Sequence, residues 1–320
     1  MNNLVAGAAF GAALTASGVY QPSVILSQLK FENFHMIQTF LTAAASSAAI
    51  VTAAQKLGYI RINPRNFSSL GLFAPYDGNI IGGMLLGTGM LLAGACPGTV
   101  LAQIGVGVRS GFYAFEGATI AGIVWSAIGK RVIQCEKTSS PKPAAYDALG
   151  VRHSTLLLAF EAVCATAVVA AYSLTSLGPE AKIPPVLGGL FIAAAQLLSI
   201  VLRRSLMGTS TSYEEVGDWF WGVLKGTFPQ RYAATVYCAG MVAGAFVVSR
   251  VYPALGQVTS VAVSPLAAGV GGFLMILGSR IAGGCTSGHG ISGMSLLSTS
   301  SFLTIGTAFA WGGLLGLVLG

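Results

Sequence analysis

The chain has 320 residues, of which 54% are hydrophobic, 8% are charged and 43 are glycine, and its formal net charge is +7. A soluble domain carries roughly 25% charged residues, so this composition excludes a protein whose whole surface faces water and predicts an all-α membrane protein. The positive charge does not indicate nucleic acid, because the basic residues lie in short connections between apolar segments. The five cysteines form no CxxC pair, so neither a metal site nor a disulfide framework is indicated, and no cofactor is expected.

About nine apolar segments follow one another along the chain. A helix needs roughly 20 residues to cross a hydrocarbon core of about 30 Å. The first and third segments, residues 4–19 and 80–95, are shorter than that. The others are residues 36–57, 112–132, 154–175, 185–202, 232–252, 263–282 and 301–319. We therefore predict about nine transmembrane helices, in a multi-pass protein that is integral to the plasma or inner membrane and surrounded by the lipid bilayer.

Two of these segments are similar to each other. Residues 80–99 read IIGGMLLGTGMLLAGACPGT, and residues 270–288 read VGGFLMILGSRIAGGCTSG. A shift of 189 positions aligns seven identical residues without a gap, and both copies end on a cysteine. Apolar glycine-rich segments also match by chance, but cysteine is rare in this chain. We interpret the match as an internal repeat.

The segments are arranged as four, one lone segment and four again. An offset of five segments is odd, so if each segment crosses once, the second four run opposite to the first. This predicts an inverted repeat, with short or broken helices from the two halves meeting near the midplane. The expected units are residues 1–132, a linker and lone helix at 133–184, and residues 185–320. Thirteen Lys and Arg residues lie on one side and four on the other, so the first side is predicted to be cytoplasmic.

Each repeat has a candidate break at its cysteine. Pro97 and Gly98 follow Cys96, and proline suits the first turn of a new helix. In the second copy, residues 286–290 follow Cys285. Backbone N–H groups at a helix start attract anions, and a thiol placed there is a soft donor. The two breaks are therefore expected to form a narrow constriction that suits a small sulfur anion, although both cysteines also fit as packing residues.

Further candidates surround the two cysteines. Arg280 lies late in an apolar segment, where an ionisable residue indicates function or a side chain that reaches the interface. Gln103 follows Cys96 by two turns, and His289 is a helix-start donor or a structural histidine. Cys164 and Cys238 have no motif around them and are interpreted as packing residues. The complete predicted substrate path is Cys96, Pro97, Gly98, Thr99, Gln103, Arg280, Cys285, Thr286, Ser287, Gly288 and His289.

The paired GACPG and GGCTSGHG motifs, with their glycine-rich lead-ins and the layout of segments, resemble the YeeE/YedE family of sulfur-compound membrane transporters. The resemblance extends over nearly the whole chain. It implies transport of thiosulfate, with Cys96 and Cys285 passing the ion along by S–H contacts. Thiosulfate-importing members carry a further cysteine near the end of the first segment, whereas residues 17–21 of this chain contain none. This departure bears on the identity of the anion.

Three functions remain open at this stage. The first is a transporter of a small inorganic sulfur anion such as thiosulfate, which is not an enzyme; a cytoplasmic sulfur-acceptor protein is a candidate partner. The second is a membrane sulfur-transfer enzyme that forms a cysteine persulfide, which requires a base beside the thiolate. The third is a channel-like protein in which the cysteines only pack. The duplicated cysteine favours the first.

Overall fold

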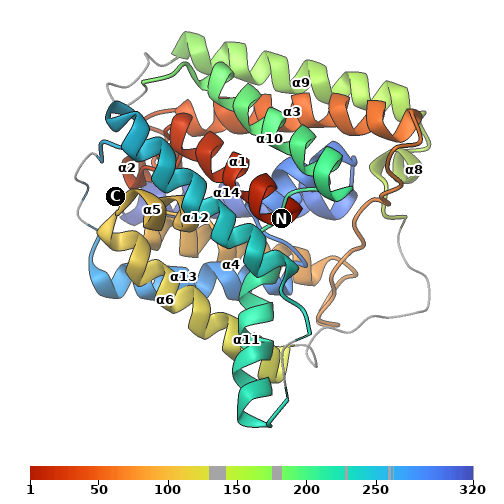
Figure 1. Ribbon diagram of the computed structural model, residues 1–320. Coiled ribbons are helices and arrows are strands. Elements are labelled where there is room, and N and C mark those ends of the chain that lie inside the picture. Colours follow the sequence, from red (N-terminus) through yellow and green to blue (C-terminus); the bar gives the residue numbers. More distant parts are fainter. Residues whose placement is uncertain (130–141, 175–181, 228–229, 259–260, 262, 320) are drawn as a thin grey trace.

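The computed structural model describes residues 1–129, 142–174, 182–227, 230–258, 261 and 263–319 (Figure 1). The first part contains α1 (Asn2–Ala16), α2 (Pro22–Leu29), α3 (His35–Lys56), α4 (Asp77–Ala93), α5 (Thr99–Val106), α6 (Arg109–Val124) and the π-helix η1 (Trp125–Gly129). The remainder contains α8 (Ala145–Leu149), α9 (His153–Leu174), α10 (Pro185–Arg203), α11 (Ser210–Leu224), α12 (Ala233–Val251), η2 (Pro253–Leu255), α13 (Pro265–Ile281), η3 (Thr286–Gly293) and α14 (Thr299–Leu319). Residues 133–141 and 175–181 of the predicted linker unit lie outside the described residues.

The protein is an all-α membrane protein, as predicted. Among the described residues, α3, α6 with η1, α9, α10, α12 and α14 are long and apolar enough to cross a membrane. A seventh span results if α13 and η3, which are bent by 45°, count as one. The predicted number of nine is not confirmed, because α1 and α4 contain only 15 and 17 residues. At 1.5 Å per residue they are about 23 and 26 Å long, and the apolar sequence segments continued past the ends of these helices.

Short helices follow the breaks in the chain. After α4 the backbone turns at Gly94, and α5 begins at Thr99; after α13 it turns at Gly283, and η3 begins at Thr286. The predicted breaks at the two cysteines are therefore present. The short helix α2 and the longer α11, which contains several acidic residues, were not predicted. Pro22 starts α2, where its missing N–H costs nothing.

The packing of the helices repeats itself between the two parts of the chain. The helix α1 packs against α12, and α10 packs against α3. Likewise α13 packs against α6, and α4 packs against α14. If α1, α3, α4 and α6 correspond to α10, α12, α13 and α14 in that order, the contact of α1 with α12 corresponds to that of α10 with α3. The contact of α13 with α6 likewise corresponds to that of α4 with α14. This supports the predicted repeat, while the unit boundaries at residues 132 and 185 stay a prediction.

The glycines of the repeated sequence allow α4 and α13 to cross closely. A Cβ atom on Gly82 would lie 2.6 Å from the carbonyl oxygen of Gly278, and one on Gly271 would lie 2.8 Å from that of Gly89. Early residues of α4 face late residues of α13 and the reverse, so the two helices are antiparallel. Small residues let helix backbones approach in a membrane. The repeated sequence therefore forms the crossing of α4 and α13. Cys96 follows the C-terminal end of α4, and Cys285 follows the C-terminal end of α13.

The helix α9 lies at the outer edge, along α3 (Figure 1). Only a few of its side chains are buried, among them Cys164 and Phe160, which pack into the main apolar core. It lies outside the paired helices, and its assignment as a lone segment between two halves stays a prediction.

Candidate functional site

Cys96 begins a self-contained turn before α5. Two residues earlier, Gly94 has a φ of 57°, the left-handed conformation that glycine adopts without a penalty and that ends α4. The N–H of Cys96 donates to Oγ1 of Thr99 at 2.7 Å, and the N–H of Thr99 donates to Sγ of Cys96 at 3.4 Å. These bonds act as a cap, so the helix begins at Thr99 and not at Pro97 as predicted. Within the part of the chain that the structure describes, the S–H of Cys96 donates to no partner.

Cys285 occupies the matching place before η3 and is fully buried. Gly283, two residues earlier, has a φ of 83°. The Sγ atom of Cys285 lies 3.3 Å from Oγ1 of Thr209 and 3.2 Å from Oγ of Ser287. The second thiol therefore lies among hydroxyl groups and the backbone N–H groups of Thr209 and Gly288, and the first accepts from the backbone N–H of Thr99. The short helix predicted after Cys285 is a π-helical segment that starts at Thr286.

A cavity of about 40 Å³ lies between the two motifs. That volume is enough for a few water molecules, and thus for an anion of a few atoms. Its wall is formed by Phe10, Leu14, Val19, Met36, Thr39, Phe40, Cys96, Gly98, Thr99, Ile192, Thr286, Ser287 and Ile291. Five of the predicted path residues therefore share one wall. No charged side chain is among the residues that line the cavity.

Two hydroxyl groups of this wall have no partner among the described residues. Thr39 of α3 and Thr286 of η3 are 0% and 3% exposed, and neither Oγ1 atom has a hydrogen-bond partner. A buried polar group without a partner is destabilising, and such groups in native structures commonly bind a ligand or a water molecule. Sequence reasoning did not identify Thr39, because a threonine within an apolar helix carries no distinguishing pattern.

Gln103 and His289 both form hydrogen bonds with backbone carbonyl or hydroxyl groups. The amide nitrogen of Gln103 donates to the carbonyl oxygens of Tyr20 and Gly94, at 2.8 and 2.9 Å. Nε2 of His289 lies 3.0 Å from the carbonyl oxygen of Ala282, which can only accept, and Nδ1 lies 2.9 Å from Oγ of Ser301. Both side chains thus tie the short helices to neighbouring turns, and neither lines the cavity.

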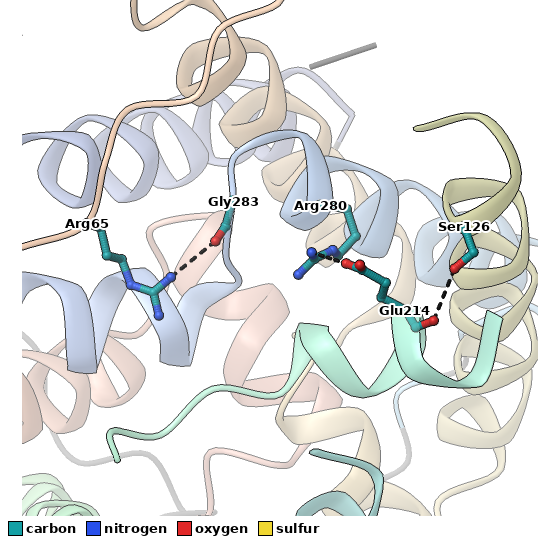
Figure 2. A network of polar contacts seen from close by, with 5 residues as sticks. All are labelled: Arg65, Ser126, Glu214, Arg280 and Gly283. Atoms are coloured by element: carbon teal, nitrogen blue, oxygen red, sulfur yellow. Dashed lines mark hydrogen bonds and ion pairs between the residues drawn. The ribbon is translucent and has the colours of Figure 1, made fainter. Parts of the chain in front are cut away.

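Arg280 forms an ion pair with Glu214 of α11 (Figure 2). The hydroxyl of Ser126 donates to the backbone carbonyl of Glu214 at 3.0 Å, which fixes this turn of α11. The side chains of Arg280 and Glu214 are 16% and 15% exposed. The positive charge of Arg280 is therefore offset inside the protein, in the place where the sequence predicted a substrate-path residue.

Arg65 is a second arginine at the same turn, and the sequence analysis missed it. It lies in the connection between α3 and α4, and its Nη1 donates to the carbonyl oxygen of Gly283 at 3.1 Å (Figure 2). Its backbone N–H donates to Oγ of Ser298 at 2.9 Å, and the hydroxyl of Ser300 donates to its carbonyl oxygen at 3.1 Å. Burial lowers the pKa of Arg65, Cys285 raises it, and the nearby Arg280 lowers it.

Cys238 also belongs to this neighbourhood. Its thiol donates to Oγ of Ser212 at 3.1 Å and points at the carbonyl oxygen of Thr209, 3.9 Å away. Thr209 in turn contacts Cys285 through its hydroxyl. The sequence placed Cys238 among packing residues, whereas the structure connects it to the second cysteine motif. Only its long-range contacts reveal this, because no motif surrounds it.

The chain is similar in sequence to known proteins. A family model described as sulphur transport matches residues 16–315. The "Thiosulfate transporter TsuA" of Spirochaeta thermophila is 25% identical over 319 residues, which cover 94% of this chain and 93% of the relative. A protein named "Probable transporter" from Xylella fastidiosa is 33% identical over 132 residues, or 39% of this chain and 90% of its own length. Its counterpart in a second strain is 32% identical over 132 residues, with the same shares.

The family match includes both cysteine motifs, the helix crossing that precedes them and all of the cavity wall except Phe10 and Leu14. It is a match to transporters and not to enzymes, as predicted. Together with the long apolar helices, it identifies a multi-pass integral membrane protein whose substrate is a small sulfur-containing anion. The chain belongs to the sulphur-transport family, which the sequence analysis identified as YeeE/YedE.

Proposed function

We propose that this transporter carries thiosulfate, or a closely related small inorganic sulfur anion, through the cavity between the two cysteine motifs. The observation that carries the proposal is that both motifs border one cavity. Cys96 contributes a thiol from the first half, and Thr286 and Ser287 contribute hydroxyls from the second. The thiosulfate transporter to which the chain is similar over 94% of its length supports this substrate.

The chemistry of the wall suits such an ion. Thiosulfate has one terminal sulfur, three oxygens and two negative charges. The unpartnered hydroxyls of Thr39 and Thr286 are available for its oxygens, and the S–H of Cys96 for its polarizable sulfur. Because no charged side chain lines the cavity, binding there is weak. Conduction requires binding that is favourable enough for the ion to enter but not too deep for it to leave.

Cys285 is the next group along the proposed path. It does not line the cavity, but its Sγ lies 3.2 Å from Oγ of Ser287, which does. An ion that leaves Cys96 would pass Thr286 and Ser287 to reach the second thiol. Residues 17–21, where the family's thiosulfate importers carry a further cysteine, contribute Val19 to the cavity wall. The path in this chain therefore has one thiol fewer at that place.

The same proposal assigns the architecture. Residues 1–132 and 185–320 form two inverted halves, and residues 133–184 form a linker and a lone helix. In each Xylella fastidiosa relative the matched 132 residues are 90% of its length, so these relatives are about half as long as this chain. This supports a unit of about half the chain. Release of a sulfur anion on the cytoplasmic side is consistent with a sulfur-acceptor protein there, which stays a prediction.

The test is uptake of radiolabelled thiosulfate, sulfite and sulfate into liposomes that contain the purified protein. We expect Cys96→Ala and Cys285→Ala each to lose most thiosulfate uptake, at a packing cost of roughly 1–2 kcal/mol in stability. Cys96→Ser and Cys285→Ser retain a donor but replace the soft sulfur by a harder oxygen, so they should also transport poorly. Cys164→Ala, on the lone helix, is the matched control. Normal uptake by both alanine variants would show that the thiols only pack.

A further inference from the structure

Arg65 presents a positive charge that no carboxylate offsets among the described residues. Within the part of the chain that the structure describes, its side chain has one hydrogen bond, from Nη1 to the carbonyl oxygen of Gly283, and no carboxylate partner. Nη2 carries no hydrogen bond to a described residue. Arg280, the other arginine at this turn, is paired with Glu214 (Figure 2). A guanidinium that is half-buried in a membrane protein without a carboxylate partner is costly and indicates a function.

The guanidinium lies beside the second thiol. A Cβ atom on Gly288 would be 3.3 Å from Nη2 of Arg65 and 3.7 Å from Sγ of Cys285, so both atoms border the same position. On Gly284, a Cβ would be 2.9 Å from Nη1, and on Gly293 it would be 3.0 Å from Cδ of Arg65. Three glycines of the second motif thus form the slot in which the arginine side chain lies.

The first half of the repeat lacks this slot. A shift of 189 positions places Ala95, Thr99 and Ile104 opposite Gly284, Gly288 and Gly293. The repeat is therefore broken at the positions that contact Arg65, while the cysteine and the left-handed glycine before it are kept in both halves. The arginine is the nearest group to a Cβ on Gly288, whereas His289 shares the space at Gly284 and Oγ of Ser301 lies nearest to Gly293.

We propose that the guanidinium of Arg65 is an anion-binding group at the Cys285 end of the transport path, where it holds the oxygen atoms of the transported sulfur anion. This inference rests on the proposed function. A guanidinium presents a planar set of N–H donors that suits an oxyanion, and its charge favours a dianion over a monoanion. The cavity beside Cys96 has no such charge, so the two ends of the path differ in affinity. Arg65 lies on the side predicted to be cytoplasmic.

The experiment compares three variants of the full-length protein in liposomes and in detergent. Arg65→Gln removes the charge, and Arg65→Lys retains it without the planar fork. Arg61→Gln, at an exposed position in the same connection, is the matched control. Two quantities are measured: the KM for thiosulfate uptake, and the rise in Tm of the purified protein when thiosulfate is added.

We expect Arg65→Gln to raise the KM by about tenfold or more, as for loss of one charge-assisted hydrogen bond. The variant should also lose most of the thiosulfate-induced rise in Tm, whatever its own Tm. The KM and the thiosulfate-induced rise in Tm of Arg65→Lys should lie between those of Arg65→Gln and the parent. Arg61→Gln should have the same values as the parent. A purely structural arginine would lower the Tm of both Arg65 variants but leave the thiosulfate-induced rise unchanged, and that result overturns the inference. If the parent itself takes up no sulfur anion, the proposed function fails instead.

Discussion

Substitution of Gly82 or Gly271 by alanine should disturb the protein to the same extent at two distant places. An added Cβ on Gly82 meets the carbonyl oxygen of Gly278 at 2.6 Å, and one on Gly271 meets that of Gly89 at 2.8 Å. Contacts below 3.0 Å to backbone atoms require α4 and α13 to move apart by several tenths of an ångström. Such overpacking typically costs about 1–3 kcal/mol. Because the breaks at both cysteines follow this crossing, transport should fall with stability.

The assay is the Tm of each purified variant together with its thiosulfate uptake. Gly306→Ala is the control, since no atom lies within 4 Å of a Cβ at that helical position. Replacing a helical glycine by alanine should there be neutral or stabilising by up to about 1 kcal/mol. We expect Gly82→Ala and Gly271→Ala to lower the Tm by similar amounts. If one variant is as stable as the parent while the other unfolds, Gly82 and Gly271 are not equivalent positions in the crossing of α4 and α13.

Three further predictions concern the site. Thr39→Val removes a hydroxyl without an internal partner, so it should lower uptake severalfold without loss of Tm, whereas Thr42→Val, one turn away and bonded to a backbone carbonyl, should not alter uptake. Arg280→Met removes the cation that pairs with the part-buried carboxylate of Glu214 and should cost roughly 3 kcal/mol, and adding Glu214→Gln should recover most of the lost Tm. Cys238→Ala should reduce uptake partially, because its thiol orders the hydroxyls near the second motif; unchanged uptake would confine it to packing.

The sequence predicted well what depends on composition and on local pattern. Low charge and apolar segments indicated the membrane, and the repeated glycines and cysteines indicated the paired breaks. The predicted number of spans is not confirmed, because apolar character continues through residues 17–19 after α1 and through Gly94 and Ala95 after α4, where the helices have already ended. The break itself depends on a left-handed glycine, which no count of apolar residues detects.

The residues that sequence reasoning missed are those whose roles arise from distant contacts. Arg65 lies in a polar connection and was counted only as a loop charge, yet it meets Gly283, 218 positions away. Arg280 was identified because it is a charge in an apolar segment, but its partner Glu214 lies in a helix that the sequence did not predict. An arginine in a connection and a threonine in an apolar helix are both ordinary in sequence. Only the fold shows which of them lacks an internal partner.

The placement of charge along the path follows from what a transporter must avoid. Two unit charges a few ångströms apart interact strongly in a medium of low dielectric, so an arginine on the wall of the central cavity would hold a dianion too firmly. Thiols and hydroxyls bind weakly, and conduction requires an ion that can leave. A guanidinium is compatible with release only where water is accessible, which fits the half-buried position of Arg65 beside the second thiol. In the proposed path the two halves each supply one thiol site, and a cation on one side alone is the simplest way to make the two ends of that path unequal.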